Sequence, residues 1–210
     1  PKATDELEMI RKWAADKTSE VDNFTIQPWD WAYLSEQYKQ AHYDLDDEMM
    51  RPYFELGRVT RGIFGLANRL YGLHFSERPV YHPDVKVYEV SDEDGSYIGL
   101  LYTDFFPREG KQNGAWMNNL RDQSEHQHPH IIIVMNFTPP SADKPSLLTA
   151  GEVETFLHEF GHALHGMLSK CRFSSLSGTS VARDFVELPS QIMENWLTEK
   201  DFLDTFARHY

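Results

Sequence analysis

The segment His158-Glu159-Phe160-Gly161-His162 constrains the fold of this chain more than any other. It has the pattern H-E-x-x-H, and on a helix residues four apart lie one above the other on the same face. Both imidazoles could then reach one zinc ion, with Glu159 placed to act on a metal-bound water. Gly161 costs a helix about 1 kcal/mol relative to alanine, which indicates that another part of the chain packs closely against the backbone there.

The residues around this segment predict a helix. The alternative for so short a pattern is a helix that carries two histidines on a solvent-exposed face. Thr149 and Glu152 form a capping box, T-x-x-E, just before an apolar run, so a helix should begin near residue 150. His158, His162 and His165 fall mostly off the core-facing stripe that this helix should bury. The stripe consists of Val153, Phe156, Leu157, Phe160, Leu164, Met167 and Leu168.

A catalytic zinc of this kind needs a third protein ligand and keeps one position open for water. The acidic candidates downstream are Asp184, Glu187, Glu194 and Glu199. We expect Ser180 to cap a second helix that runs from Arg183 to about Thr198 and that Pro189 kinks or delays. Its packing positions should be Val186, Ile192, Met193 and Trp196. Spacing alone does not choose between Glu187 and Glu194, and either could be only a solvated carboxylate.

Three helices are expected in the first third of the chain. The first should cover about Thr4 to Ala15. The second should begin near Pro28, which a first helical turn tolerates, and run past Tyr38. The third should follow Pro52 and end at Gly72, with apolar residues at helical spacing. Those apolar residues are Leu56, Val59, Ile63, Leu66 and Leu70.

The middle of the chain changes to a strand period. Val85–Val90 and Tyr97–Phe105 flank a turn-forming group at residues 92–95 and predict a hairpin. Ile131–Phe137 is a continuous apolar strand candidate. The expected fold is mainly α with a small β-sheet (α+β). It comprises a helical segment at residues 1–76, a small β-sheet segment at 77–145 and paired zinc-binding helices at 146–210, all in one lobe.

Two other groups of residues suggest sites less strongly. His126, His128 and His130 alternate as if on one strand face, but their polar neighbours favour a solvated loop. Gly110 and Gly114, with a nearby arginine and lysine, lack the spacing of a phosphate loop and favour a hairpin or flexible turn.

Composition excludes several classes of partner. The 210 residues include 20 basic and 33 acidic ones, a formal net charge of −13, so nucleic acid is not an expected partner. No apolar stretch approaches the length of a membrane span. The single Cys171 excludes an intrachain disulfide and suits a reducing compartment, so we expect a cytoplasmic location. Its thiol should be buried or half-buried rather than a nucleophile.

The chain resembles the zinc oligopeptidase family, which includes thimet oligopeptidase, oligopeptidase A and peptidyl-dipeptidase. The resemblance is strongest in residues 147–165 and in a second signature formed by residues 178–179, 183–191 and 194–196. It implies a zincin-like catalytic core segment of a larger helical enzyme, with short peptides as substrates and Zn²⁺ as cofactor. It implies that His158, His162 and Glu187 bind the zinc and that Glu159 is the catalytic base.

Two short segments, Leu176–Thr179 and Gly114–Met117, look most like the peptidyl-dipeptidase branch, whose members remove C-terminal dipeptides. An endo-acting oligopeptidase is the alternative, as is a fragment that binds metal or peptide without catalysis. Whole members of the family are several times longer. The family's late segment, with a histidine and tyrosines that contact substrate, has no counterpart here, so the isolated chain should be poorly active. The sequence does not determine the oligomeric state.

Overall fold

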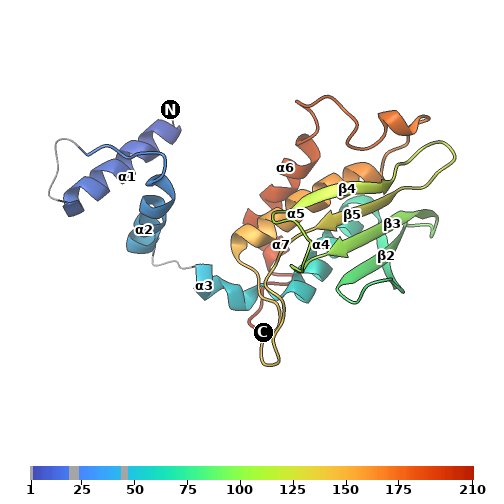
Figure 1. Cartoon of the computed structure of the whole chain (residues 1–210), viewed down its shortest axis with the longest axis horizontal. Coiled ribbons are helices and arrows are strands. Elements are labelled where there is room, and N and C mark those ends of the chain that lie inside the picture. Colours follow the sequence, from blue (N-terminus) through green and yellow to red (C-terminus); the bar gives the residue numbers. More distant parts are fainter. Residues whose placement is uncertain (1, 19–23, 44–46) are drawn as a thin grey trace. The chain divides into compact units, whose positions relative to one another are not determined.

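The computed structural model describes residues 2–18, 24–43 and 47–210 (Figure 1). Contacts divide the chain into two compact units, Pro1–Met49 and Met50–Tyr210. The first unit holds α1 (Lys2–Thr18) and α2 (Trp31–Tyr43), which contact each other through the rings of Trp13 and Tyr38 at 5.5 Å. The helix expected from Pro28 begins three residues later, because a turn between Gln27 and Asp30 precedes it.

The second unit begins at Met50, the last residue of the short α3 (Asp47–Met50). A 3-10 turn (Arg51–Tyr53) follows, and α4 then covers Leu56–Tyr71. The Glu55 side chain caps α4 by accepting the backbone N–H groups of residues 57 and 58. The helix ends at Gly72, whose φ of 72° is a conformation that glycine adopts without strain, as expected. Of the five apolar residues at helical spacing, Leu56, Val59, Ile63 and Leu66 are buried, whereas Leu70 is 42% exposed.

Five strands form one mixed sheet in the order β1-β2-β3-β5-β4. They are β1 (His74–Arg78), β2 (Val85–Ser91), β3 (Tyr97–Asp104), β4 (Trp116–Arg121) and β5 (His130–Val134). The antiparallel pair β2–β3 confirms the expected hairpin, and β3 pairs with β5 in parallel. The strand expected over Ile131–Phe137 ends earlier, although the N–H groups of residues 135 and 137 still donate to the carbonyl oxygens of Asp104, the last residue of β3, and of Phe105.

The sequence did not indicate β1 or β4. Both lie at edges of the sheet, and most of their side chains are exposed or half-buried. An edge strand therefore lacks the apolar alternation by which a half-buried strand is recognised. Together the helices and the small sheet confirm the expected mainly α, α+β architecture.

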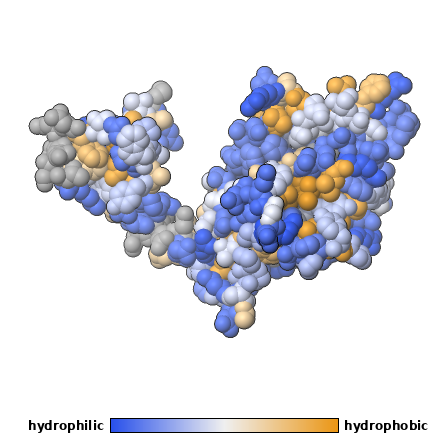
Figure 2. Space-filling view, in the orientation of Figure 1, coloured by the Kyte–Doolittle hydropathy of each residue, from blue (hydrophilic) through white to orange (hydrophobic). Residues whose placement is uncertain are grey.

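The core lies between the sheet and two long helices. The second of these, α5 (Ala150–Met167), packs against β3, β4 and β5, while α4 packs against β1. Figure 2 shows that the visible face of the molecule is mostly hydrophilic, with separate hydrophobic patches. In the described part of the chain, no helix is apolar and long enough to cross a membrane.

The prediction of a helix from Arg183 to Thr198 is wrong about where the helix begins. Residues 183–187 form turns, α6 covers Leu188–Glu194, and a 3-10 turn follows at Asn195–Thr198 before α7 (Lys200–Leu203). Pro189 explains the late start, because it lacks an N–H group and fits only the first turn of a helix. Ser180 therefore caps no helix. Ile192, expected as a packing position, is 53% exposed, whereas Met193 is buried.

Candidate metal centre

The helix that carries the H-E-x-x-H segment begins as the sequence indicates. The backbone N–H of Glu152 donates to Thr149 Oγ1 at 3.1 Å, and the Thr149 N–H donates to the Glu152 carboxylate at 2.7 Å. This reciprocal pair satisfies two of the N–H groups that a helix start leaves without intrahelical partners. The expected apolar stripe is buried, apart from the half-buried Leu168 that ends the helix.

Gly161 lets α6 approach α5 closely. A Cβ atom on Gly161 would lie 2.6 Å from the carbonyl oxygen of Pro189 and 2.6 Å from Cα of Ser190. Real side chains do not make such short contacts, so only glycine fits this position without a shift of the backbone. The expectation that something packs against the helix here is confirmed. The contact places the first turn of α6, and Glu187 just before it, beside the two histidines.

Three side chains meet at one point. Glu187 Oε2 lies 3.3 Å from His158 Nε2 and 3.1 Å from His162 Nε2. One donor atom from each residue lies within 4.8 Å of the others, and among the described residues this is the one such group of histidines, cysteines and carboxylates. Tetrahedral zinc with bonds of about 2.0–2.2 Å would hold its ligand atoms roughly 3.3 Å apart, so both distances from the Glu187 oxygen fit a zinc ion.

Glu187 is free to serve as a ligand. It precedes α6 directly, yet its side chain makes no capping hydrogen bond. Instead its carboxylate accepts the hydroxyl of the fully buried Ser190 at 2.8 Å. That hydrogen bond, helped by the nearby imidazoles of His162 and His158, lowers the pKa of Glu187 and favours the ionised carboxylate.

Glu194 orients the first histidine. Its Oε1 lies 2.5 Å from His158 Nδ1, on the opposite side of the ring from Glu187. A carboxylate oxygen accepts hydrogen bonds, so this contact favours the tautomer that carries its proton on Nδ1 and leaves a lone pair on Nε2 for a metal. A cation placed between His158 Nε2 and the Glu187 oxygen, which lie 3.3 Å apart, would be bonded by both atoms. The donor set therefore fits a metal ion.

The second histidine is held neutral by its surroundings. His162 is buried, and burial lowers its pKa despite the opposing effect of the Glu187 carboxylate. Its Nδ1 atom is buried with no hydrogen-bond partner in the described structure. A neutral imidazole is the form that binds metals.

Glu159 neighbours His158 in the chain, but its carboxylate is not one of the three converging donor groups. Its side chain is mostly buried at 7% exposed. Burial raises the pKa of its carboxyl, against the lowering effects of His158 and of a hydrogen bond from the backbone of Met117 in β4. The edge strand β4 thus touches the one acidic residue of the H-E-x-x-H segment.

The remaining sequence candidates lie elsewhere. Asp184 and Glu199 are exposed and belong to no cluster of metal-binding side chains in the described residues. His126 and His128 are exposed, in agreement with the solvated loop, whereas His130 is half-buried as the first residue of β5, so the loop prediction is wrong for it. Cys171 is half-buried as expected. Sequence reasoning missed the role of Ser190, although a serine three residues after a glutamate is a recognisable hydrogen-bonding spacing. It considered Glu194 as a ligand or as a solvated carboxylate, but not as a partner of His158.

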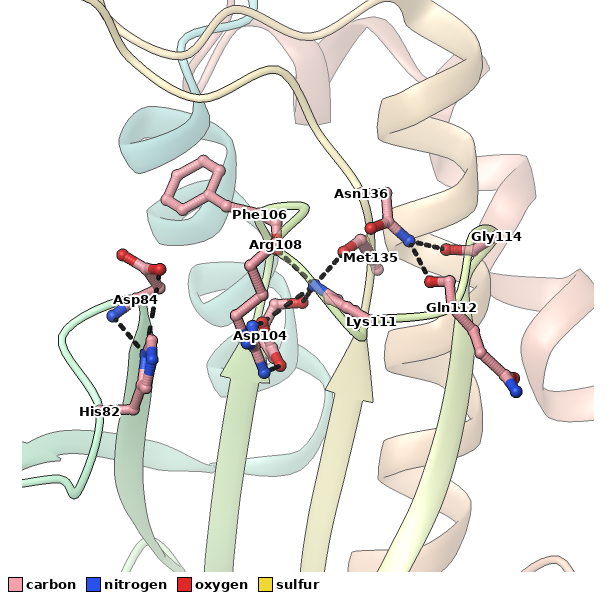
Figure 3. A network of polar contacts seen from close by, with 10 residues as sticks. All are labelled: His82, Asp84, Asp104, Phe106, Arg108, Lys111, Gln112, Gly114, Met135 and Asn136. Atoms are coloured by element: carbon pink, nitrogen blue, oxygen red, sulfur yellow. Dashed lines mark hydrogen bonds and ion pairs between the residues drawn. The ribbon is translucent and has the colours of Figure 1, made fainter.

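The loop between β3 and β4 is anchored rather than flexible (Figure 3). Arg108 donates two hydrogen bonds to the Asp104 carboxylate. Lys111, only 4% exposed, donates to Asp104 Oδ1 at 2.9 Å and to the carbonyl oxygens of Phe106 and Met135 at 2.7 and 2.5 Å. This loop is not the expected hairpin, because β3 and β4 do not pair, and the ion pairs of the buried Asp104 with Arg108 and Lys111 hold it at the end of β3.

The same loop positions β4, which packs against α5. Asn136 Nδ2 donates to the carbonyl oxygens of Gln112 and Gly114 at 3.0 and 2.8 Å (Figure 3). Residue 114 lies two residues before β4, and β4 supplies the backbone group that contacts Glu159. The anchored loop therefore sets where β4 enters the sheet beside α5.

An α+β fold with an H-E-x-x-H helix and a glutamate that directly precedes a neighbouring helix is an arrangement that suits a metal-dependent peptidase. The whole chain, residues 1–210, matches the sequence profile of Peptidase family M3. The chain therefore belongs to peptidase family M3.

Individual relatives agree with this assignment. The chain is 46% identical to the dipeptidyl carboxypeptidase of Escherichia coli (strain K12) over all of its length, which covers 31% of that protein. It is 41% identical to oligopeptidase A of the same organism, again over its whole length and over 32% of that protein. It is also 42% identical to a thimet-like oligopeptidase of Dictyostelium discoideum, over 80% of this chain and 27% of the relative. The chain thus spans about a third of the length of these relatives.

Proposed function

We propose that this chain forms the catalytic core of a zinc-dependent peptidase that hydrolyses short peptides. The observation that carries the proposal is the meeting of His158 Nε2, His162 Nε2 and Glu187 Oε2 at one point. A structural zinc site usually has four protein ligands, whereas a catalytic site has three and one open position. The membership of peptidase family M3 supports the same activity.

His158, His162 and Glu187 would hold the metal, and Glu194 would keep the His158 ring in its ligating tautomer. When bound, zinc would supply a Lewis acid that polarises the peptide carbonyl and lowers the pKa of water towards about 7. With one ionised carboxylate, Glu187, and two neutral imidazoles as ligands, the zinc ion would keep one net positive charge. That charge would help it to polarise the carbonyl and to acidify the water.

Glu159 would be the general base. Its carboxylate would accept a proton from the attacking water and deliver it to the leaving amine. Burial raises its pKa, which brings the carboxyl nearer to the range in which it can both take and return a proton. A site that only bound metal or peptide would have no use for this buried carboxylate beside the ligands, so its presence favours catalysis over binding alone.

We further propose that the enzyme releases dipeptides from the C-terminus of its substrates. The 46% identity to a dipeptidyl carboxypeptidase supports this. The alternative is internal cleavage, which the 41% identity to an oligopeptidase A keeps open. Both alternatives use the same metal ligands and the same base.

The decisive experiment combines metal analysis with product analysis. The purified chain should contain about one zinc per molecule, and a chelator such as 1,10-phenanthroline should remove both the zinc and the hydrolysis of a short peptide. Mass spectrometry of the products then separates successive C-terminal dipeptides from internal fragments. A chain that binds no zinc, or whose hydrolysis survives complete removal of zinc, would refute the proposal.

A further inference from the structure

A pocket with positively charged walls lies between α4 and α7, two helices that contact each other. Its volume of about 560 Å³ is within the range of roughly 300–1,000 Å³ that is typical of small-ligand pockets. Its basic lining residues are Arg58, Arg61, Arg69, Arg208 and His209. Among the described residues, no aspartate or glutamate lines it. Although the whole chain has a formal net charge of −13, the charge of this pocket therefore selects an anion.

The pocket is built by close contacts between two distant parts of the chain. A Cβ atom on Gly62 of α4 would overlap the ring of Phe206, so glycine at this position lets the ring pack directly on the helix. Close by, Arg58 Nη1 donates to the carbonyl oxygens of Arg208 and His209 at 2.9 and 3.1 Å. These contacts hold the backbone of residue 208 beside α4, so that its side chain lines the same pocket as the arginines of the helix.

Three of the four arginine side chains are available to a ligand. In the part of the chain that the structure describes, the guanidinium groups of Arg61, Arg69 and Arg208 make no ion pair and no hydrogen bond. All three residues are exposed. The helix backbone between the first two is accessible as well, because a Cβ atom on Gly65 would meet nothing within 4 Å. An anion can therefore reach the donors from both walls of the pocket.

We propose that this pocket binds the phosphate chain of an oligophosphate. Guanidinium groups donate paired hydrogen bonds to phosphate and carboxylate oxygens. A phosphate group carries more negative charge and more acceptor oxygens than a carboxylate, so a short oligophosphate can bind several guanidinium groups at once. Arg61 and Arg69 are eight positions apart (69 − 61), which is roughly 12 Å along a helix axis. This spacing favours an extended anion over a single phosphate.

The phosphate chain belongs either to a free inorganic oligophosphate or to a nucleotide. The pocket shares no residue with the proposed zinc ligands or with Glu159, so the proposal is independent of the peptidase activity.

The test titrates sodium tripolyphosphate into the 210-residue chain in a phosphate-free buffer and follows binding by isothermal titration calorimetry. We expect saturable binding with a dissociation constant of roughly 1 mM or tighter at about 0.1 M salt. The affinity should fall as the salt concentration rises, because exposed charges are screened. The absence of saturable binding under these conditions would overturn the proposal.

Two matched double variants locate the site. The Arg61→Gln, Arg69→Gln variant should bind tripolyphosphate more weakly by about 10-fold or more, because one hydrogen bond to a charged group typically contributes such a factor. The Arg78→Gln, Arg172→Gln variant removes the same amount of positive charge from exposed side chains outside the pocket, so its affinity should stay within about twofold of the wild type. Arg208→Gln, on the other wall, should also weaken binding.

Equal affinities of the two double variants would overturn the proposal. Binding that depended only on net charge would weaken equally in both variants. Binding through a metal at the proposed zinc site would weaken in neither. Far-UV circular dichroism checks that each variant is folded, and the exposed positions of the substituted arginines favour this outcome.

ATP and tetraglutamate distinguish the sources of the anion. If ATP binds more tightly than tripolyphosphate and loses affinity in the same variants, the ligand is a nucleotide. If ATP binds no more tightly, the ligand is a free oligophosphate. If tetraglutamate binds as tightly as tripolyphosphate, the pocket recognises acidic peptide segments and the assignment to phosphate is wrong.

Discussion

Gly161 on α5 lies where Pro189 leaves no room for a side chain: a Cβ atom there would be 2.6 Å from the Pro189 carbonyl oxygen. This contact brings the segment that carries Glu187 to the histidines of α5. The two parts of the proposed zinc site, 25 to 29 positions apart in the chain (187 − 162 and 187 − 158), depend on one residue that has no side chain.

Gly161→Ala should therefore damage both the fold and the metal site. Forcing a methyl group into this contact should lower the free energy of unfolding by about 1–3 kcal/mol and weaken zinc binding as α6 moves away. Gly151→Ala, in the same helix, is the matched control. A Cβ atom there would have Thr149 Oγ1, at 4.0 Å, as its nearest neighbour. Denaturant unfolding and zinc titration measure both effects, and equal stability of the two variants would contradict the close packing.

Glu187→Gln should remove the negatively charged member of the proposed ligand set. Zinc affinity should fall by more than about 100-fold, beyond the loss typical for residues that only support a ligand. The control is Glu199→Gln, because this exposed glutamate lies outside the cluster. Competition with a chromophoric chelator measures the affinity. If Glu187→Gln binds zinc as well as Glu199→Gln does, Glu187 is not a ligand.

Glu194→Gln should have a smaller effect of the same sign. The amide can still meet His158 Nδ1 but no longer bears the charge that fixes its proton. Residues in this supporting position typically change metal affinity by about 10- to 100-fold. The expected order of zinc affinity is therefore wild type, then Glu194→Gln, then Glu187→Gln. The reverse order of the two variants would exchange the roles of the two glutamates.

Glu159→Gln should separate metal binding from catalysis. The variant should retain zinc, because the Glu159 carboxylate is not among the three converging donor atoms. Peptide hydrolysis should fall by on the order of 10²-fold or more, the loss expected when a general base is removed. Zinc content and peptide turnover are measured on the same preparation. Loss of zinc together with activity would make Glu159 a ligand or a structural residue.

Asp104→Asn should destabilise the protein in a pH-dependent way. Removing the Asp104 carboxylate leaves the nearly buried Lys111 ammonium without an anionic partner. Such a loss typically lowers the free energy of unfolding by about 3–5 kcal/mol. Burial tends to raise the pKa of Asp104, but the hydrogen bonds from Arg108 and Lys111 outweigh it and hold the pKa below its ordinary value.

The sign of the pH effect follows from that lowered pKa. The unfolded chain has an Asp pKa of about 3.9, so the ion pair contributes fully above this pH and is lost as the pH falls through the lower folded value. The free energies of unfolding of the wild type and of Asp104→Asn, measured with urea, should differ most near neutral pH and become equal in strong acid. Asp143→Asn, at an exposed position, should match the wild type throughout. A constant difference at all pH values would assign the effect to packing.

The sequence alone determined the features that depend on neighbouring residues. The capping box of Thr149 and Glu152, the apolar stripe of α5, the end of α4 at Gly72 and the hairpin of β2 and β3 all follow from short-range periodicity and local hydrogen bonds. The motif-bearing helix could be predicted for the same reason, as could the close contact at Gly161, since an interior glycine is costly unless something needs the space.

Only the tertiary structure decided which glutamate faces the two Nε2 atoms. Glu187 and Glu194 are equivalent in spacing, and they differ because Pro189 delays α6 and because α6 packs onto Gly161, so that one carboxylate lies beside Nε2 and the other beside Nδ1. The edge strand β4 and the burial of Lys111 likewise depend on partners far along the chain. Such contacts leave no periodic signal in the sequence, because the groups that satisfy them come together only when the chain has folded.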